Sequence, residues 1–139
     1  MKARIGAALA ALALAAVGIG CGSSEDKTTS TEAEHAGTPQ QAIAEIAEVR
    51  SGLAAALATY KAGDESAADE QVGDTYLRHF EEVEGPLEEV DPELNEQLED
   101  AIREELRSEI RSGASAASVA ALVREINARL DEAKQALQS

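Results

Sequence analysis

The chain has 139 residues, of which 44% are hydrophobic, 28% charged and 2% aromatic, and its formal net charge is −15. This length suits a single domain. The acidic balance argues against nucleic acid as a partner, because phosphate binding needs a basic patch. The single cysteine excludes an intrachain disulfide framework and a multi-thiolate zinc site.

Residues 1–20 are typical of a secretory signal peptide. Lys2 and Arg4 give it a basic start, and residues 5–19 form an uninterrupted apolar run. That run is shorter than the roughly 20 apolar residues that a membrane-spanning helix needs.

Small residues then lead into Cys21, with Gly18 three positions before it and Gly20 and Gly22 on either side. The pattern resembles the lipobox of bacterial lipoproteins, which usually has Leu at the position of Gly18. The resemblance implies that Cys21 is lipidated and begins the mature chain, anchored on the extracytoplasmic face of the cell membrane. Two acyl chains on one residue give the paired anchor that stable attachment needs. The alternative is an ordinary cleaved signal with a free thiol.

Residues 22–37 contain no large apolar side chain. Such a segment cannot bury enough surface to offset its ordering entropy. We therefore expect residues 21–37 to be a lipidated cysteine followed by a flexible tether, and residues 38–139 to be the folded domain.

The first helix is predicted to begin at Thr38, because Pro39 and Gln41 complete a capping pattern, and to end at Gly63-Asp64. A second helix is predicted from Ser66 to about Glu84, where Gly85-Pro86 breaks or kinks it. Its predicted core positions are Val72, Tyr76, Leu77, Phe80 and Val83.

A third helix is predicted to start at Asp91-Pro92 and to end near Gly113, and a fourth opens at Ser115 or Ser118. No run alternates at period two, so no strand is expected. Helices of about 20 residues joined by short turns favour an all-α domain, an antiparallel up-and-down four-helix bundle.

No catalytic arrangement is present in the sequence. There is no nucleophile constellation, phosphate-binding glycine loop or His-Glu-x-x-His helix. We therefore do not expect an enzyme.

Several carboxylates fall among apolar positions of the helices. At about 100° per residue, Glu84 lies inside the apolar arc of the second helix, Glu81 lies just beyond it, and His79 borders its opposite edge. On the third helix Glu99 falls between apolar positions. An isolated buried charge is very costly, so such a carboxylate must be paired, protonated or metal-bound.

Three interpretations of these carboxylates stay open. Carboxylates that converge from facing helices build hard-cation and iron sites in bundle proteins. Alternatively, Glu84 or Glu99 pairs with Arg78, Arg103 or Arg107 in a structural ion-pair network. The third interpretation is a solvated face, since residues 81–109 hold thirteen acidic residues and two arginines.

A longer pattern of residues runs through the second, third and fourth predicted helices. It consists of Tyr76, Phe80-Glu81, Glu84, Glu99 with Ile102, Gly113, and the helix from Val119 to Leu137. In this order and spacing, the stretch from Asp74 to Ala133 resembles the extracytoplasmic helical region found with the high-affinity iron permease family. The resemblance implies iron or another divalent cation as ligand, and an iron permease or other envelope protein as partner. Transport itself is not expected, because the permease's Arg-Glu-x-x-Glu motif is missing from the sequence.

The sequence therefore supports two functions. The first is a membrane-anchored lipoprotein that binds a cation through Glu81, Glu84 and Glu99, with His79 as a further candidate ligand, for capture or delivery to a permease. The second is a non-catalytic structural or protein-interaction module at the cell envelope.

Overall fold

The computed structural model describes residues 37–139, and these are helical apart from short turns. The predicted signal peptide, the lipidation of Cys21 and the tether up to residue 36 lie outside the described residues. The helical segments are α1 (Pro39–Lys61), α2 (Glu65–Thr75), η1 (Tyr76–Phe80), α3 (Glu81–Val90), α4 (Pro92–Asp100), η2 (Ala101–Leu106), α5 (Arg107–Arg111) and α6 (Ala116–Ala136).

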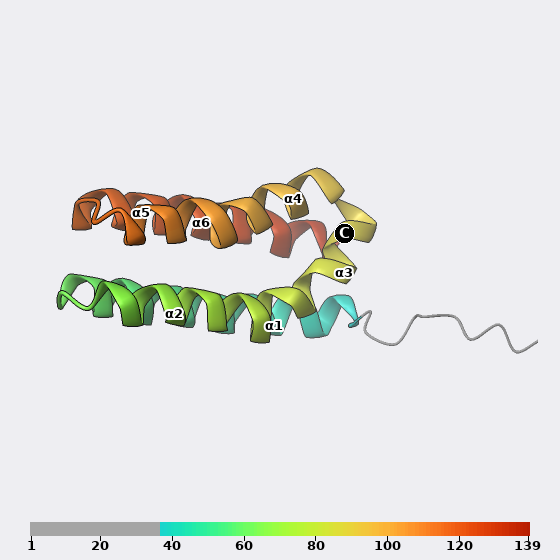
Figure 1. Ribbon diagram of the computed structural model, residues 1–139. Coiled ribbons are helices and arrows are strands. Elements are labelled where there is room, and N and C mark those ends of the chain that lie inside the picture. The colour runs from blue at the N-terminus through green and yellow to red at the C-terminus, as the bar shows by residue number, and fades with distance from the viewer. Residues whose placement is uncertain (1–36) are drawn as a thin grey trace, which may run out of the picture. The chain divides into compact units, whose positions relative to one another are not determined.

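These segments make four helices, which confirms the predicted all-α four-helix bundle (Figure 1). The first helix is α1 and the fourth is α6. The second helix is the continuous run α2–η1–α3, and the third is α4–η2–α5. The segments η1 and η2 are π-helical turns, one in the middle of each of these two helices.

Local capping chemistry sets most of the helix ends, as the sequence predicts. Thr38 and Gln41 form a capping box with hydrogen bonds of 2.8 and 3.3 Å. Asp91 accepts from the backbone N–H of Leu94 at 3.1 Å, and Ser115 caps α6. Gly63 and Gly113 end their helices with φ of 93° and 67°, a conformation that favours glycine.

The prediction that Ser66 starts the second helix is wrong. The cap is Asp64, whose side chain accepts from the backbone N–H of Ala67 at 3.0 Å. Asp is as good an N-cap as Ser, and its position directly after the Gly63 turn starts the helix earlier.

Of the two outcomes predicted at Gly85-Pro86, a break or a kink, the break near Glu84 is wrong, because the helix continues through Pro86 to Val90. Figure 1 shows that α3 turns away from the line of α2 toward α4. Gly85 has no Cβ to crowd the proline ring, and Pro86 is buried. Packing of this segment therefore outweighs the hydrogen bond that the proline removes.

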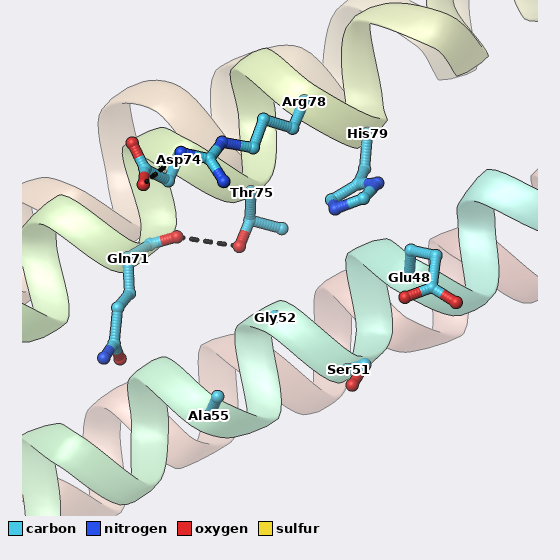
Figure 2. Close-up of a pocket in the computed structure, with 9 residues that line it drawn as sticks. All are labelled: Glu48, Ser51, Gly52, Ala55, Gln71, Asp74, Thr75, Arg78 and His79. Atoms are coloured by element: carbon cyan, nitrogen blue, oxygen red, sulfur yellow. Dashed lines mark hydrogen bonds and ion pairs between the residues drawn. The ribbon is translucent and has the colours of Figure 1, made fainter.

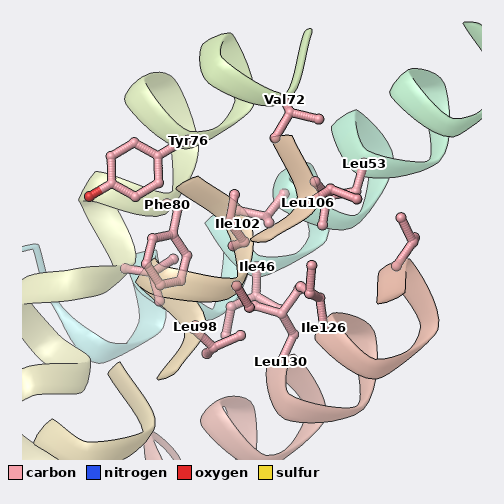
Figure 3. Close-up of a cluster of buried hydrophobic side chains, with 14 of the residues drawn as sticks. Ile46, Leu53, Val72, Tyr76, Phe80, Leu98, Ile102, Leu106, Ile126 and Leu130 are labelled. Carbon is pink, nitrogen blue, oxygen red and sulfur yellow. The ribbon is translucent and has the colours of Figure 1, made fainter. Parts of the chain in front are cut away.

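The core is aliphatic and draws on all four helices. Tyr76 and Phe80 supply its aromatic part on the second helix, with ring centroids 5.7 Å apart (Figure 3). Leu77, predicted as a core residue, is instead 60% exposed. A π turn takes in one more residue than an α turn, so η1 rotates Leu77 away from the core. No helix among residues 37–139 is long and apolar enough to span a membrane.

Polar contacts fix how the first helix meets its neighbours. Arg50 donates to the backbone carbonyl of Asn127 at 3.0 Å, and the Tyr60 hydroxyl donates to the carbonyl of Ala114. On the other side of α1, Gly52 lies against Thr75 of the second helix, where a Cβ would come within 2.2 Å of the Thr75 hydroxyl. Glycine therefore permits the close approach of these two helices.

A candidate carboxylate site between the second and third helices

The site is centred on Tyr76, at the start of η1. The Tyr76 ring lies beside Phe80 in the core, and its hydroxyl points away from that cluster (Figure 3). The hydroxyl donates a hydrogen bond to Oε1 of Glu84, which is half-buried on α3. A core residue thus holds one of the predicted carboxylates in place.

The third helix contributes Glu99 and Arg103, one helical turn apart. Nη1 of Arg103 donates to Oε1 of Glu99 at 2.5 Å, and the guanidinium lies 5.3 Å from the centroid of the Tyr76 ring. This distance fits a cation–π contact. Tyr76 therefore contacts a carboxylate of its own helix and the cationic partner of Glu99 on the third helix.

Burial and like charges act together on Glu84. Its pKa is raised, first by burial and then by the negative charges of Glu99 and Glu81, whereas the hydrogen bond from Tyr76 and the charge of Arg103 lower it. The pKa of Tyr76 is raised too, mainly by burial and by its bond to Glu84. The three predicted carboxylates thus interact electrostatically, with Arg103 as the nearby cation.

Glu81 is exposed and lines a cavity of about 280 Å³ beside this cluster. Tyr76 and Arg103 form another part of the cavity wall, so the cavity adjoins the carboxylates. Among residues 37–139, however, no three His, Cys, Asp or Glu side chains are grouped closely enough to hold a metal ion.

His79 faces a different part of the molecule. Its Nδ1 lies 2.7 Å from Oε2 of Glu45 on α1. Figure 2 shows it in a second cavity, of about 340 Å³, between α1 and the second helix, close to Thr75 and Gly52. The structure thus separates His79 from the three glutamates.

One of the alternative interpretations is confirmed in part, since Glu99 forms an ion pair with Arg103. Sequence reasoning did not find the Tyr76–Glu84 bond, although Tyr76 and Glu84 both lie in the predicted apolar arc. It also did not find the bidentate pair of Arg107 with Asp69, at 2.8 and 3.0 Å. These two residues are 38 positions apart in sequence, and their pair joins the second and third helices.

Comparisons with known proteins add no relative: no family model, no curated protein and no solved structure matches this chain.

Proposed function

We propose that this chain is a lipid-anchored extracytoplasmic protein that binds a cation, with iron as the first candidate, through Glu81, Glu84 and Glu99. Its role is to capture the cation or deliver it to a membrane permease. The anchor is Cys21, on the resemblance of its surroundings to a lipobox.

The observation that carries the proposal is the meeting of the second and third helices at Tyr76, whose hydroxyl bonds to Glu84 and whose ring lies under Arg103, the partner of Glu99. Glu99 and Glu81 are near enough to raise the pKa of the half-buried Glu84. Among residues 37–139 the three side chains do not form a ready-made metal site, so a bound cation has to draw them together. The cation also relieves the repulsion between these carboxylates. Carboxylate oxygens are ligands for hard cations, which is consistent with ferric iron, Mn²⁺ or Ca²⁺.

Arg103 occupies the position of a counter-ion in this cluster, through its pair with Glu99. A cation that binds both Glu84 and Glu99 must take over that role, so Arg103 has to release Glu99. His79 takes no part, because it pairs with Glu45 on α1.

The test is thermal unfolding of the full chain in detergent, with and without Fe²⁺, Fe³⁺, Mn²⁺, Zn²⁺ or Ca²⁺. A ligand that binds the folded state raises the melting temperature by mass action. We expect at least one of these ions to do so, and the double variant Glu84→Gln/Glu99→Gln to lose that rise. The matched control is Glu89→Gln/Glu96→Gln, which removes the same charge from exposed positions of α3 and α4. It should keep the rise.

Membrane attachment is tested separately. Cys21→Ala should release the protein from the membrane or leave its precursor unprocessed. Unchanged attachment contradicts the lipid anchor without bearing on the cation site.

A second candidate function, a protein-interaction module, is favoured by the exposed side chains of Leu77 and Val90 on the second helix, at 60% and 51% exposure. If no metal ion shifts the melting temperature, or if the double glutamine variant keeps the shift, this second function replaces the first.

A further inference from the structure

A cavity of about 280 Å³ opens between the second and third helices, and its wall contains two arginines of this otherwise acidic protein. The lining residues are Gly73, Tyr76, Leu77, Glu81, Arg103 and Arg107. We propose that this cavity binds a small organic carboxylate, whose oxygens accept hydrogen bonds from the two guanidinium groups. The proposal goes beyond the cation site and does not depend on it.

Arg107 is held in place and still has donors to offer. Of the five N–H groups of a guanidinium, two are used on Asp69, through Nε and Nη2. Gly73 lies directly opposite, and a Cβ built on it comes 3.6 Å from Cζ and 3.7 Å from Nη1 of Arg107. The missing side chain at Gly73 therefore leaves space next to the unused N–H groups.

Arg103 contributes the second guanidinium. Its Nη1 bonds to Glu99, and the group lies over the face of the Tyr76 ring, which limits its motion. A carboxylate between Arg103 and Arg107 receives charge-assisted hydrogen bonds, which are roughly twice as strong as neutral ones.

Beside Arg107, the arginines around Asp69 carry one more positive charge than that carboxylate balances, in a chain whose net charge is −15. Asp69 is shared by Arg107 and by Arg111, whose Nη1 lies 3.6 Å from Oδ1, so these two arginines exceed their carboxylate partner by one charge. Glu81 is exposed to solvent. Repulsion from more distant acidic residues is screened beyond about 8 Å at physiological salt.

The apolar wall selects an organic ligand over an inorganic one. Leu77 is 60% exposed at the cavity, and the Tyr76 ring forms another part of its wall. A carbon skeleton that covers Leu77 removes apolar surface from water, at about 25 cal/mol per Å². Inorganic phosphate satisfies the guanidinium groups but leaves this surface exposed.

The experiment uses the full chain in detergent after metal removal, with succinate and tricarballylate as probes and inorganic phosphate for comparison. Binding is followed by calorimetry and by NMR of the arginine Nε–H groups. We expect saturable binding of at least one organic acid, stronger than that of phosphate, with shifts of the Arg103 and Arg107 signals. Arg103→Gln should weaken it about tenfold, as expected for loss of one charge-assisted hydrogen bond.

Two further variants test the location. Gly73→Leu should fill the cavity and abolish binding. Arg129→Gln should leave binding unchanged, because Arg129 does not line the cavity. Its pair with Glu125 on α6 spans four residues, like the pair of Arg103 with Glu99. Circular dichroism checks that each variant is folded. No binding of either organic acid, equal binding of phosphate, or unchanged affinity in both Arg103→Gln and Gly73→Leu overturns the proposal. Since no metal is present, none of these results bears on the cation site.

Discussion

The hydroxyl of Tyr76 donates a hydrogen bond to Glu84, eight residues further along the same helix. In a regular α-helix, seven residues make about two turns and eight overshoot that position. The π turn η1 (Tyr76–Phe80) takes in one extra residue, so that eight residues complete about two turns and Glu84 comes to lie above Tyr76. The same extra residue turns Leu77 outward.

Tyr76→Phe tests this bond. The hydrogen bond from the hydroxyl lowers the pKa of Glu84, against the effects of burial and of the neighbouring carboxylates. Its removal should therefore raise the pKa of Glu84, measured by NMR titration of the side-chain carboxyl carbon, and reduce the free energy of unfolding by about 1 kcal/mol. Tyr60→Phe, on α1, is the control and should leave the Glu84 titration unchanged. An unchanged or lower pKa of Glu84 in Tyr76→Phe contradicts the role of the bond.

The sequence predicts features that depend on neighbours within one helical turn. Thr38, Asp91 and Ser115 cap their helices as expected, because an N-cap needs only a side-chain oxygen and the N–H two or three residues on. Glu99 and Arg103 lie four residues apart, and their pairing was among the alternatives for the same reason.

What the sequence did not predict depends on tertiary packing. A helical wheel with a constant angle per residue cannot represent the π turn η1. It therefore places Leu77 in the core and does not align Tyr76 with Glu84. His79 pairs with Glu45, which lies 34 positions away in the sequence, so no local spacing predicts the contact. Continuation through Pro86 depends on burial of α3, which outweighs the local signal to stop.

The two tyrosines of the chain should both resist ionisation. Burial raises the pKa of Tyr60 above 10.0, with Glu65 and Glu109 adding to it, and the pKa of Tyr76 is raised by burial and by Glu84. The unfolded chain loses its phenolic protons at lower pH than the folded chain does. The contribution of these two tyrosines to the free energy of unfolding is therefore fully present below pH 10.0 and is lost as pH rises above it. The ultraviolet absorbance of tyrosinate should stay low at pH 10 in folded protein. Half-ionisation there, without unfolding, contradicts this prediction.

The Asp69–Arg107 pair should dominate the acid side of the stability profile. The pKa of Asp69 is lowered, mainly by its hydrogen bonds from Arg107, so the pair stabilises the fold above the ordinary value of 3.8 and this contribution is lost as pH falls below it. Asp69→Asn should lower the free energy of unfolding by about 1–3 kcal/mol at neutral pH. Urea unfolding should show the difference from the parent protein shrinking below pH 3.8.

The control for this pair is Glu125→Gln, which breaks the more exposed pair with Arg129 on α6. Surface pairs of this kind contribute about 0–1 kcal/mol. If both substitutions have the same small effect at neutral pH, the bidentate bond between the second and third helices is not a significant source of stability.

Two glycines inside helices should respond oppositely to alanine. A Cβ on Gly52 would lie 2.2 Å from Oγ1 and 2.7 Å from Cγ2 of Thr75, whose hydroxyl is held by the carbonyl of Gln71 at 2.7 Å. Gly52→Ala should therefore destabilise by about 1–3 kcal/mol, in spite of the better helix propensity of alanine. A Cβ on Gly73 meets only ordinary contacts, at 3.6 Å or more. Gly73→Ala should stabilise by about 0.5–1 kcal/mol.

Thr75→Ala in the Gly52→Ala background separates crowding from other effects of the substitution. It removes Oγ1 and Cγ2, the two Thr75 atoms nearest to the Cβ added at position 52, and leaves only the Cβ of residue 75, 3.0 Å away. Part of the lost free energy of unfolding should therefore return. In the parent protein the same Thr75→Ala change removes buried contacts and the bond to Gln71, and it should destabilise. Urea unfolding of the four proteins gives the coupling between the two sites. Additive effects would mean that the first and second helices do not depend on glycine for their close approach.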